Sequence, residues 1–284
     1  MTYIDLEAKG MNLYHTFLNG QCFRWHDMRE GKFAGVVGEK VYEAQMVDEN
    51  TLRLHGASQN ERDFFIRYFD LERDYVAIEH NLKEMDVVLH EAVDFGRGMR
   101  ILKQDPWETL ISFILSVQKN IASTQKTIEC LCEQFGRKIG HHHDAYTFPT
   151  AAELVAADED HIRQTKCGFR AKGVADAARQ IDMGHVVLED IFDMSYERGS
   201  EELQKIYGVG QKVADCILLF GFGKVLACPV DTWMKKAFEV LYHVRFEDMT
   251  AYSRFAQERW GAYSGYAQQY IFYFMRENYN KIKK

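Results

Sequence analysis

The chain has 284 residues, of which 46% are hydrophobic and 27% are charged, a composition typical of a globular protein with a sizeable core. No apolar run is long enough to span a bilayer and the first residues lack the pattern of a secretory signal, so we expect an intracellular protein. The net charge of −7 excludes a protein that is basic over its whole surface, and six scattered cysteines suit a reducing compartment.

The N-terminal part favours β-structure over residues 12–55. Residues 20–25 alternate in a way that places Phe23 and Trp25 on one side of a strand. Residues 32–37 and 40–47 flank Gly38-Glu39, a two-residue turn that begins with glycine, as a type II′ hairpin requires. Residues 51–55 predict a further strand. From residue 60 the apolar spacing becomes helical.

Helix signals dominate after residue 100. Asp105 and Thr150 each predict a helix start, with Pro106 at the first helical position and Glu three residues after each cap. We expect an α+β protein with an N-terminal domain over residues 1–100, built from an antiparallel sheet and helices, and an all-helical domain over residues 101–284. The expected helices after the first cap cover residues 121–135, 158–166, 170–183, 196–206, 232–243, 250–260 and 264–279.

The stretch from residue 203 to 231 carries the strongest functional signal. Gly208 and Gly210 form a turn between two expected helices, where free N–H groups and the positive end of a helix dipole can hold a phosphate. Lys212 and Cys216 follow on one face of the second helix, and Asp231 can cap the helix after it. Taken alone, such a lysine is usually a solvated surface residue and such an aspartate is usually only a cap.

GVGQKVADC at residues 208–216 and PVD at residues 229–231 resemble the helix-hairpin-helix, Gly/Pro-Asp signature of base-excision DNA glycosylases. In detail they are similar to 8-oxoguanine DNA glycosylases of the eukaryotic type, and the resemblance extends over nearly the whole chain. It implies a cytoplasmic, nucleoid-associated monomer that flips 8-oxoguanine out of duplex DNA, removes it and nicks the strand. Two alternatives stay open: a glycosylase for another oxidised or alkylated base, and a helix-hairpin-helix module that only binds DNA.

The resemblance implies that Lys212 and Asp231 are catalytic. Cleavage of an N-glycosidic bond builds positive charge on the sugar, so a neutral amine can attack the sugar carbon while a carboxylate stabilises that charge. The attached amine becomes a Schiff base, through which β-elimination nicks the strand. A module that only binds DNA has no need for this pair.

Four further residues resemble the base-reading residues of the family. Gly20 matches the glycine whose carbonyl accepts the N7 hydrogen of 8-oxoguanine; guanine has a lone pair there and leaves that acceptor unpaired, at a cost of about 1–3 kcal/mol. The resemblance also implies that Cys216 forms a charged dipole with Lys212 facing the base. Gln268 reads the Watson–Crick edge and Phe272 stacks on the face, and their i, i+4 spacing places both on one side of a helix.

Other matches concern the gap left by the extruded base and the partner base. Several departures from the family, including Gln118 for an asparagine, Phe169 for a tyrosine, Ser123 for an arginine and Trp233 for a histidine, predict relaxed choice of the opposite base. Arg170 retains one of two arginines that read cytosine. The expected DNA-binding residues are Gln118, Asn120, Phe169, Arg170, Gly208, Gly210 and Trp233.

We expect no metal and no iron–sulfur cluster, because Cys130, Cys132 and Cys167 lack the four-cysteine spacing. Residues 141–143, three consecutive histidines, are expected in a solvated loop. Carbonyls around residues 204, 206 and 209 resemble a family site for a monovalent cation. A local basic face could still bind duplex DNA despite the negative net charge; its expected members are Arg170, Lys172, Lys205, Lys212, Lys224, Lys235 and Lys236.

Overall fold

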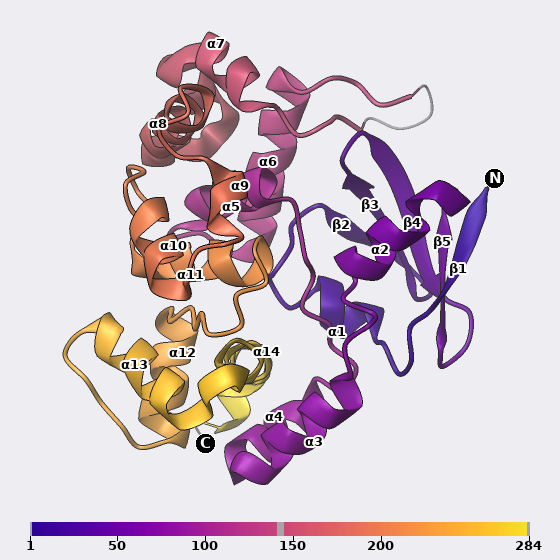
Figure 1. Ribbon diagram of the computed structural model, residues 1–284, viewed down its shortest axis with the longest axis vertical. Helices are drawn as coiled ribbons and strands as arrows, with labels where there is room; N and C mark the ends of the chain where they lie inside the picture. Colours follow the sequence, from indigo (N-terminus) through magenta and orange to yellow (C-terminus); the bar gives the residue numbers. More distant parts are fainter. Residues whose placement is uncertain (1, 141–144, 283–284) are drawn as a thin grey trace.

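A five-stranded antiparallel sheet lies beside a larger body of helices (Figure 1). The computed structural model describes residues 2–140 and 145–282. Neighbouring strands pair in the order β1-β5-β4-β3-β2, so the N-terminal strand lies at one edge of the sheet. The strands are β1 (Tyr3–Glu7), β2 (Trp25–Arg29), β3 (Lys32–Val37), β4 (Lys40–Met46) and β5 (Thr51–His55).

The expected hairpin around residue 38 is confirmed. Val37 pairs with Lys40, and Gly38 adopts a φ of 59°, a conformation that glycine adopts without strain. The strand at residues 51–55 is also confirmed, and it pairs with β1, for which no strand was expected. The side chains of Ile4 and Leu6 are buried there, so β1 belongs to the hydrophobic core of the sheet.

The expectation of β-structure at residues 12–24 is wrong. Helix α1 (Leu13–Phe17) forms there, capped by Asn12, and an irregular loop follows it. Phe23 and Trp25 do not share one environment: Phe23 lies 5.5 Å from the ring of Phe113 in the helical core, whereas Trp25 stacks on Phe17 at 4.4 Å in the core of the sheet. Because this short segment supplies side chains to two cores, its alternation is not that of a strand.

Most expected helices are confirmed, including α5, which begins at Pro106 with Asp105 as its cap, and α7, which has the full capping box at Thr150. The expected helix at residues 158–166 begins at a break within α7, where Asp158 has a φ of 56° and accepts the backbone N–H groups of Asp160 and His161. Its last turn is a π-turn, Arg163–Cys167. Among the described helices, none is both long and apolar enough to cross a membrane. The α-helices after the sheet are α2 (Arg62–Tyr68), α3 (Tyr75–Met85), α4 (Val87–Phe95), α5 (Pro106–Ser116), α6 (Ile121–Phe135), α7 (Ala151–Ile162), α8 (Ala171–Asp182), α9 (Leu188–Ile191), α10 (Tyr196–Leu203), α11 (Gln211–Phe220), α12 (Thr232–Leu241), α13 (Met249–Trp260) and α14 (Ser264–Ile282).

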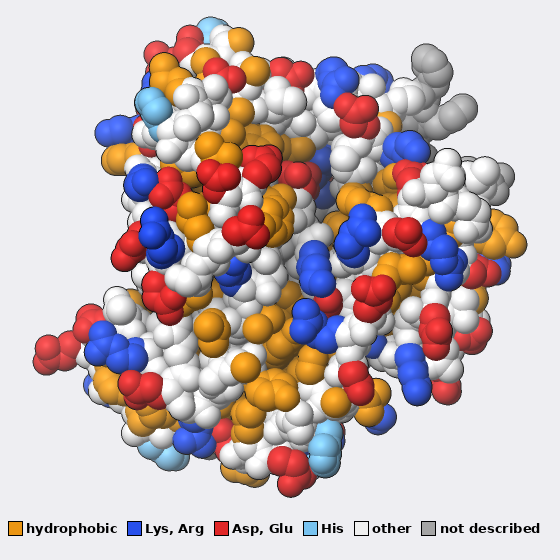
Figure 2. All heavy atoms as spheres, in the orientation of Figure 1, with side chains coloured by type: hydrophobic (Ala, Val, Ile, Leu, Met, Phe, Trp, Pro, Cys, Tyr) orange, Lys and Arg blue, Asp and Glu red, His pale blue; other side chains and the backbone are white. Residues whose placement is uncertain are grey.

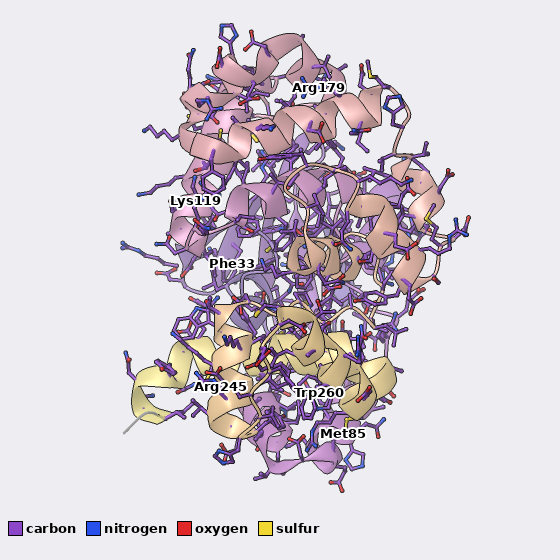
Figure 3. All side chains as sticks on the ribbon, turned by 90° about the vertical axis from the view of Figure 1, so that its left-hand side faces the viewer. Phe33, Met85, Lys119, Arg179, Arg245 and Trp260 are labelled. Carbon is purple, nitrogen blue, oxygen red and sulfur yellow. The ribbon has the colours of Figure 1, made fainter. Side chains whose placement is uncertain are left out.

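Two hydrophobic cores organise these elements. The smaller core lies between the sheet, α1 and α2, and the larger one joins α3–α14, with Trp260 inside its C-terminal lobe (Figure 3). Helix α4 packs against α14, and α3 packs on α4 and contacts α14 through Glu79, which accepts the Tyr270 hydroxyl at 2.9 Å, although both helices precede residue 100. The expected domain limits, 1–100 and 101–284, stay a prediction, but the packing places these two helices with the helical body.

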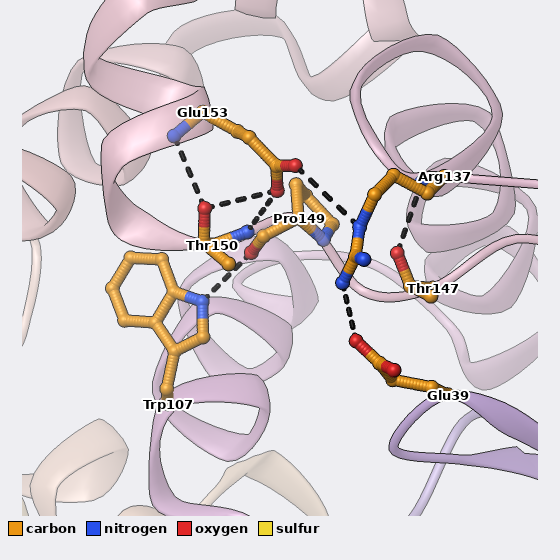
Figure 4. A network of polar contacts seen from close by, with 7 residues as sticks. All are labelled: Glu39, Trp107, Arg137, Thr147, Pro149, Thr150 and Glu153. Carbon is orange, nitrogen blue, oxygen red and sulfur yellow. Dashed lines mark hydrogen bonds and ion pairs between the residues drawn. The ribbon is translucent and has the colours of Figure 1, made fainter.

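Polar contacts fasten the β3–β4 hairpin to the helical body (Figure 4). Arg137, which follows α6, pairs with Glu39 in the hairpin turn, and its backbone N–H donates to the hydroxyl of Thr147 at 3.0 Å. The indole of Trp107 donates to the carbonyl of Pro149 at 2.8 Å, just before the Thr150 cap. The network therefore orients the sheet relative to α5, the helix that forms one wall of the cavity described next.

Candidate active site

A small cavity of about 50 Å³ lies where α5, α11, α14 and the loop after α1 meet. The two expected catalytic residues, Lys212 and Asp231, both line it. The structure thus brings together residues that are as much as 252 positions apart in the chain. The cavity also contains all the expected base-binding residues, and its full lining is Gly20, Phe113, Lys212, Cys216, Phe220, Pro229, Asp231, Gln268, Gln269 and Phe272.

The turn between α10 and α11 has the expected helix-hairpin-helix form. Gly208 has a φ of 85°, so glycine is favoured at this position. Gly210 has ordinary backbone angles and caps α11, and a Cβ atom built there would meet nothing within 4 Å. Because no side chain covers the start of α11, its free N–H groups are accessible to a phosphate.

A separate surface depression follows the hairpin and is lined by residues 204–210 together with Asp176 and Gln180. The carboxylate of Asp176 accepts a hydrogen bond from the backbone N–H of Tyr207 at 2.8 Å. A carboxylate at this edge of the depression opposes an anion and favours a cation.

Lys212 occupies the first turn of α11 and is half-buried. Its ammonium nitrogen lies 5.5 Å from the centre of the Phe113 ring, on the wall of the cavity. The Cys216 thiol, one turn later on the same helix, lines the same cavity. The amine therefore lies inside the cavity instead of extending into solvent.

Asp231 has the capping role that the sequence predicts. Its Oδ1 accepts hydrogen bonds from the backbone N–H groups of Trp233 and Met234, both at 2.9 Å. Burial raises the pKa of the carboxyl, and the Met234 N–H and the charge of Lys212 oppose that rise. The second oxygen has no protein donor among the described residues and is free to face a positive charge.

The thiol of Cys216 does not match the charged pair that the resemblance implies. Burial raises the pKa of Cys216 to about 11, although the charge of Lys212 opposes this. The thiol is therefore neutral near pH 7 in this conformation. Lys212 and Cys216 line the same cavity, but burial disfavours the ionised form of the sulfur.

The base-binding residues converge from three segments, the loop after α1, helix α11 and helix α14. Gly20 has a φ of 95°, and a Cβ atom there would lie 3.0 Å from Ile121 Cδ1 and 3.5 Å from Phe272 Cε1. Gln268 is 3% exposed, yet its Oε1 has no hydrogen-bond partner. A buried, unpaired acceptor is rare in folded proteins and indicates a place where a ligand donor binds.

The residues expected to fill the gap that the extruded base leaves in the duplex also lie close together. Phe169 is 58% exposed and lies under the Arg170 guanidinium, at 4.4 Å from ring centre to carbon. Arg170 donates from Nε to the carbonyl of Val117 at 2.6 Å and from Nη1 to that of Cys167 at 3.0 Å. Gln118, next to Val117, is exposed with a left-handed φ of 54°. The two segments therefore form one unit.

Asn120 and Trp233 have structural contacts in addition to their expected role on DNA. Asn120 caps α6 by accepting the N–H of Ser123 at 2.8 Å. The ring of Trp233 lies 5.6 Å from that of Tyr279, and the Lys236 ammonium lies over both rings, at 4.5 and 4.7 Å. A cation held on two aromatic rings beside Asp231 is placed to meet a phosphate.

Not every lysine expected in a basic face is available for DNA. Lys224 is used internally, because its ammonium donates to the carbonyls of Phe192 and Met194 at 2.9 and 2.6 Å. On the face in Figure 2 the charges are mixed, and acidic side chains gather beside a hollow between the two lobes. Lys119 lies at the edge of Figure 3 that is turned away from that face. The gap-filling segments thus lie on the side opposite these acidic groups.

Three lining residues had no functional signal in the sequence, namely Phe113, Phe220 and Gln269. From the sequence, the two phenylalanines have the pattern of ordinary core residues in apolar helices. Gln269 is 2% exposed on a helix rich in aromatic residues. A second glutamine directly after Gln268 was the one available hint, because a buried amide requires partners.

Within residues 2–140 and 145–282, no three His, Cys, Asp or Glu side chains form a group that could hold a metal ion. Cys132 and Cys167 are buried, Cys130 is half-buried, and all have free thiols. The expectation for the three histidines at 141–143 lies outside the described residues.

Comparisons with known proteins agree with this geometry. The family model for the 8-oxoguanine DNA glycosylase N-terminal domain matches residues 3–110, and that for the HhH-GPD superfamily of base excision DNA repair proteins matches residues 111–261. The crystal structure of Clostridium acetobutylicum 8-oxoguanine glycosylase/lyase, in complex with duplex DNA containing cytosine opposite 8-oxoguanine, is 38% identical with a TM-score of 0.92, over 98% of this chain and 99% of that chain.

A curated relative, the N-glycosylase/DNA lyase of Saccharomyces cerevisiae, is 28% identical over 304 residues, which cover 89% of this chain and 80% of the relative. The 3-methyladenine DNA glycosylase of Archaeoglobus fulgidus shares the fold, with a TM-score of 0.76 at 19% identity. A glycine hairpin beside a cavity with a lysine and a capping aspartate defines the helix-hairpin-helix class of DNA repair enzymes. The chain belongs to the HhH-GPD superfamily and, within it, to the 8-oxoguanine DNA glycosylase family.

Proposed function

We propose that the protein is a bifunctional base-excision enzyme that removes 8-oxoguanine from duplex DNA and nicks the strand at the resulting abasic site. The observation that carries this proposal is the shared cavity of Lys212 and Asp231, which also contains Gly20, Gln268 and Phe272. A module that only binds DNA has no use for an amine and a carboxylate in one cavity that is also lined by an unpaired amide oxygen and an aromatic ring.

The reaction follows from the two catalytic side chains. The neutral amine of Lys212 forms a bond to C1′ of the flipped nucleoside as the bond from C1′ to the base breaks, and the base leaves with the electron pair and takes up a proton. Asp231 stabilises the positive charge that builds on the sugar. The C1′–O4′ bond then breaks, the sugar ring opens as O4′ takes up a proton lost by the amine, and C1′ and the nitrogen form a Schiff base. Loss of a C2′ proton then expels the 3′ phosphate by β-elimination. Hydrolysis releases the lysine.

The base is recognised by groups that the free protein leaves unsatisfied. The Gly20 carbonyl accepts the N7 hydrogen that 8-oxoguanine has and guanine lacks. The unpaired Oε1 of Gln268 accepts from the Watson–Crick edge of the base, and Phe272 stacks on its face. These contacts favour the oxidised purine over an alkylated purine or an oxidised pyrimidine.

We further propose relaxed choice of the opposite base. Arg170 already uses Nε and Nη1 on the carbonyls of Val117 and Cys167, which leaves Nη2 as its one nitrogen without a partner among the described residues. A single donor can meet an acceptor on any of the four bases. Ser123 stands where the family has a second arginine, so a second contact specific for cytosine is missing.

We also propose an oligomeric state, a location and a cation site for the enzyme. The enzyme acts as a monomer on chromosomal DNA in the cytoplasm, and it needs no iron–sulfur cluster. A monovalent cation binds carbonyls of the hairpin around Gln204, Ile206 and Val209, which line one depression that also contains the carboxylate of Asp176.

The test is a panel of duplexes that contain 8-oxoguanine, an alkylated purine or an oxidised pyrimidine, each opposite all four bases. We expect single-turnover excision of 8-oxoguanine with a modest spread among opposite bases and none by Lys212→Gln. Faster removal of another lesion would support the sibling glycosylase. Binding without excision of any lesion would support the non-catalytic module, and a steep preference for cytosine would contradict the relaxed choice.

A further inference from the structure

The loop that carries Gly20 is held by side chains that donate to its carbonyl groups. Arg276 of α14 donates from Nη2 to the carbonyl of Leu18 at 2.7 Å, and Gln269 of the same helix donates to that of Asn19 at 3.4 Å. On the other side of Gly20, Gln104 donates to the carbonyl of Gln21 at 2.7 Å. Three of the four successive carbonyls thus have a side-chain donor.

The carbonyl of Gly20 is the exception. Within the described residues, neither a backbone N–H nor a side chain donates to it, although Gly20 lies at the wall of the cavity. Gly20 is half-buried, and an unpaired carbonyl at the wall of the cavity, in a loop whose neighbouring carbonyls are paired, indicates an acceptor available to a ligand.

Arg276 also contacts the other side of the base-binding site. Its side chain is 16% exposed, and its guanidinium carbon lies 5.6 Å from the centre of the Phe272 ring. Its Nη1 is buried without a partner, and a Cβ atom at Gly20 would lie 3.4 Å from it. The Arg276 side chain therefore contacts both the loop whose Gly20 carbonyl would accept a hydrogen bond from the base and the Phe272 ring that would stack on the base.

We propose that Arg276, assisted by Gln269, is a positioning residue that sets the Gly20 carbonyl relative to Phe272 and thereby the selectivity for 8-oxoguanine. The inference rests on the proposed function and deepens it. Arg276 acts through the Leu18 carbonyl and does not line the cavity itself. A hydrogen bond to the N7 hydrogen requires its acceptor to be fixed within about 0.5 Å, and a left-handed glycine loop does not supply that rigidity alone.

The experiment separates base reading from the rest of the reaction. Arg276→Met keeps an apolar stem against Phe272 but removes the donor to Leu18, whereas Arg276→Lys keeps one cationic donor. Each variant is assayed by single-turnover excision of 8-oxoguanine and, separately, by nicking of a duplex with a preformed abasic site. Nicking needs Lys212 and duplex binding but no base, so it reports on folding and on the catalytic amine. Arg254→Met, an exposed arginine of α13, is the matched control.

We expect Arg276→Met to slow excision by about tenfold, the effect of removing one charged donor from a buried carbonyl, while nicking stays within about twofold of the original protein. The excision rate of Arg276→Lys should lie between those of Arg276→Met and the original protein. Arg254→Met should change neither excision nor nicking. Equal losses of excision and nicking, or no loss of excision, would overturn the inference. If the original protein itself excises no 8-oxoguanine, the proposed function falls and the inference falls with it.

Discussion

Lys212 and Asp231 face the same cavity from the starts of two different helices, α11 and α12. The first turn of α11 carries the amine of Lys212, and the capping residue of α12, Asp231, supplies the carboxylate. One oxygen of this carboxylate accepts backbone N–H groups, and the other has no donor among the described residues. Helix starts are rigid, so the two groups need no rearrangement of the chain to act on a sugar between them.

The two roles of Asp231 can be separated by a pair of substitutions. Asp231→Asn retains an oxygen that accepts the N–H groups of Trp233 and Met234, so stability should change little, whereas Asp231→Ala should lose about 1 kcal/mol of unfolding free energy with the cap. Both should slow base excision by about 10²–10³-fold, because each removes the negative charge. Urea unfolding and single-turnover rates check this. Normal excision by Asp231→Asn would show that Asp231 is only a cap.

The base-binding amide should reduce the stability of the free protein. Gln268→Leu removes a buried Oε1 that has no partner, so we expect the free energy of unfolding to rise by about 1 kcal/mol. Affinity for a duplex with 8-oxoguanine should fall, while affinity for a duplex with an abasic site should stay the same. Both affinities are measured with Lys212→Gln as the background. A loss of stability, or equal losses on both duplexes, would mean that Gln268 has a structural partner and does not read the base.

The helix starts could be predicted from the sequence because caps follow local rules. Asp105, Thr150 and Asp231 each accept the N–H groups that a capping residue accepts, whatever the rest of the chain does. Helix α1 could not be predicted in the same way, because it has five residues and tertiary packing decides it. The alternation at Phe23 and Trp25 wrongly predicted a strand for the same reason, because two different cores bury the two side chains.

The sequence predicted those residues of the candidate site that the family resemblance names. It did not predict the residues that hold them in place. The side chains that hold the site in shape make contacts across the whole chain: Gln269 and Arg276 contact the Gly20 loop over 250 and 258 positions. No local pattern indicates such a contact. The charge state of Cys216 also depends on burial, which the spacing of residues 212 and 216 does not reveal.

The exposed ring of Phe169 should serve DNA binding and not folding. We expect Phe169→Ala to change the unfolding free energy by less than about 0.5 kcal/mol, because the ring is exposed. Its affinity for a duplex with 8-oxoguanine should fall by about tenfold or more, the usual effect of losing one aromatic contact with the bases. Phe64→Ala, which removes an exposed ring of α2, should leave that affinity unchanged. Unchanged binding by Phe169→Ala would contradict the wedge role.

The buried carboxyl of Asp215 predicts a pH dependence of stability. Burial raises its pKa to about 7, although Tyr196 and Gln211 donate to it at 2.7 and 2.9 Å. Between the ordinary value of 3.8 and about 7, the folded protein holds a proton that the unfolded chain has released, so the unfolding free energy falls as pH rises through this range.

Asp215→Asn cannot ionise and should lose that part of the slope, which amounts to at most about 4 kcal/mol since one pKa unit corresponds to about 1.4 kcal/mol. Urea unfolding from pH 4 to pH 8 measures it. Asp182→Asn, at an exposed position of α8, should keep the slope of the original protein. Identical slopes for Asp215→Asn and the original protein would show that Asp215 is ionised throughout.

Borohydride trapping tests the central claim most directly, because it detects the bond between the Lys212 nitrogen and the sugar carbon. The protein is mixed with a duplex containing 8-oxoguanine and with sodium borohydride, and the mixture is resolved under denaturing conditions. We predict a covalent adduct of protein and DNA with the original protein and none with Lys212→Gln. An adduct of undiminished yield with Lys212→Gln, or no adduct with the original protein while the base is still removed, would contradict the account.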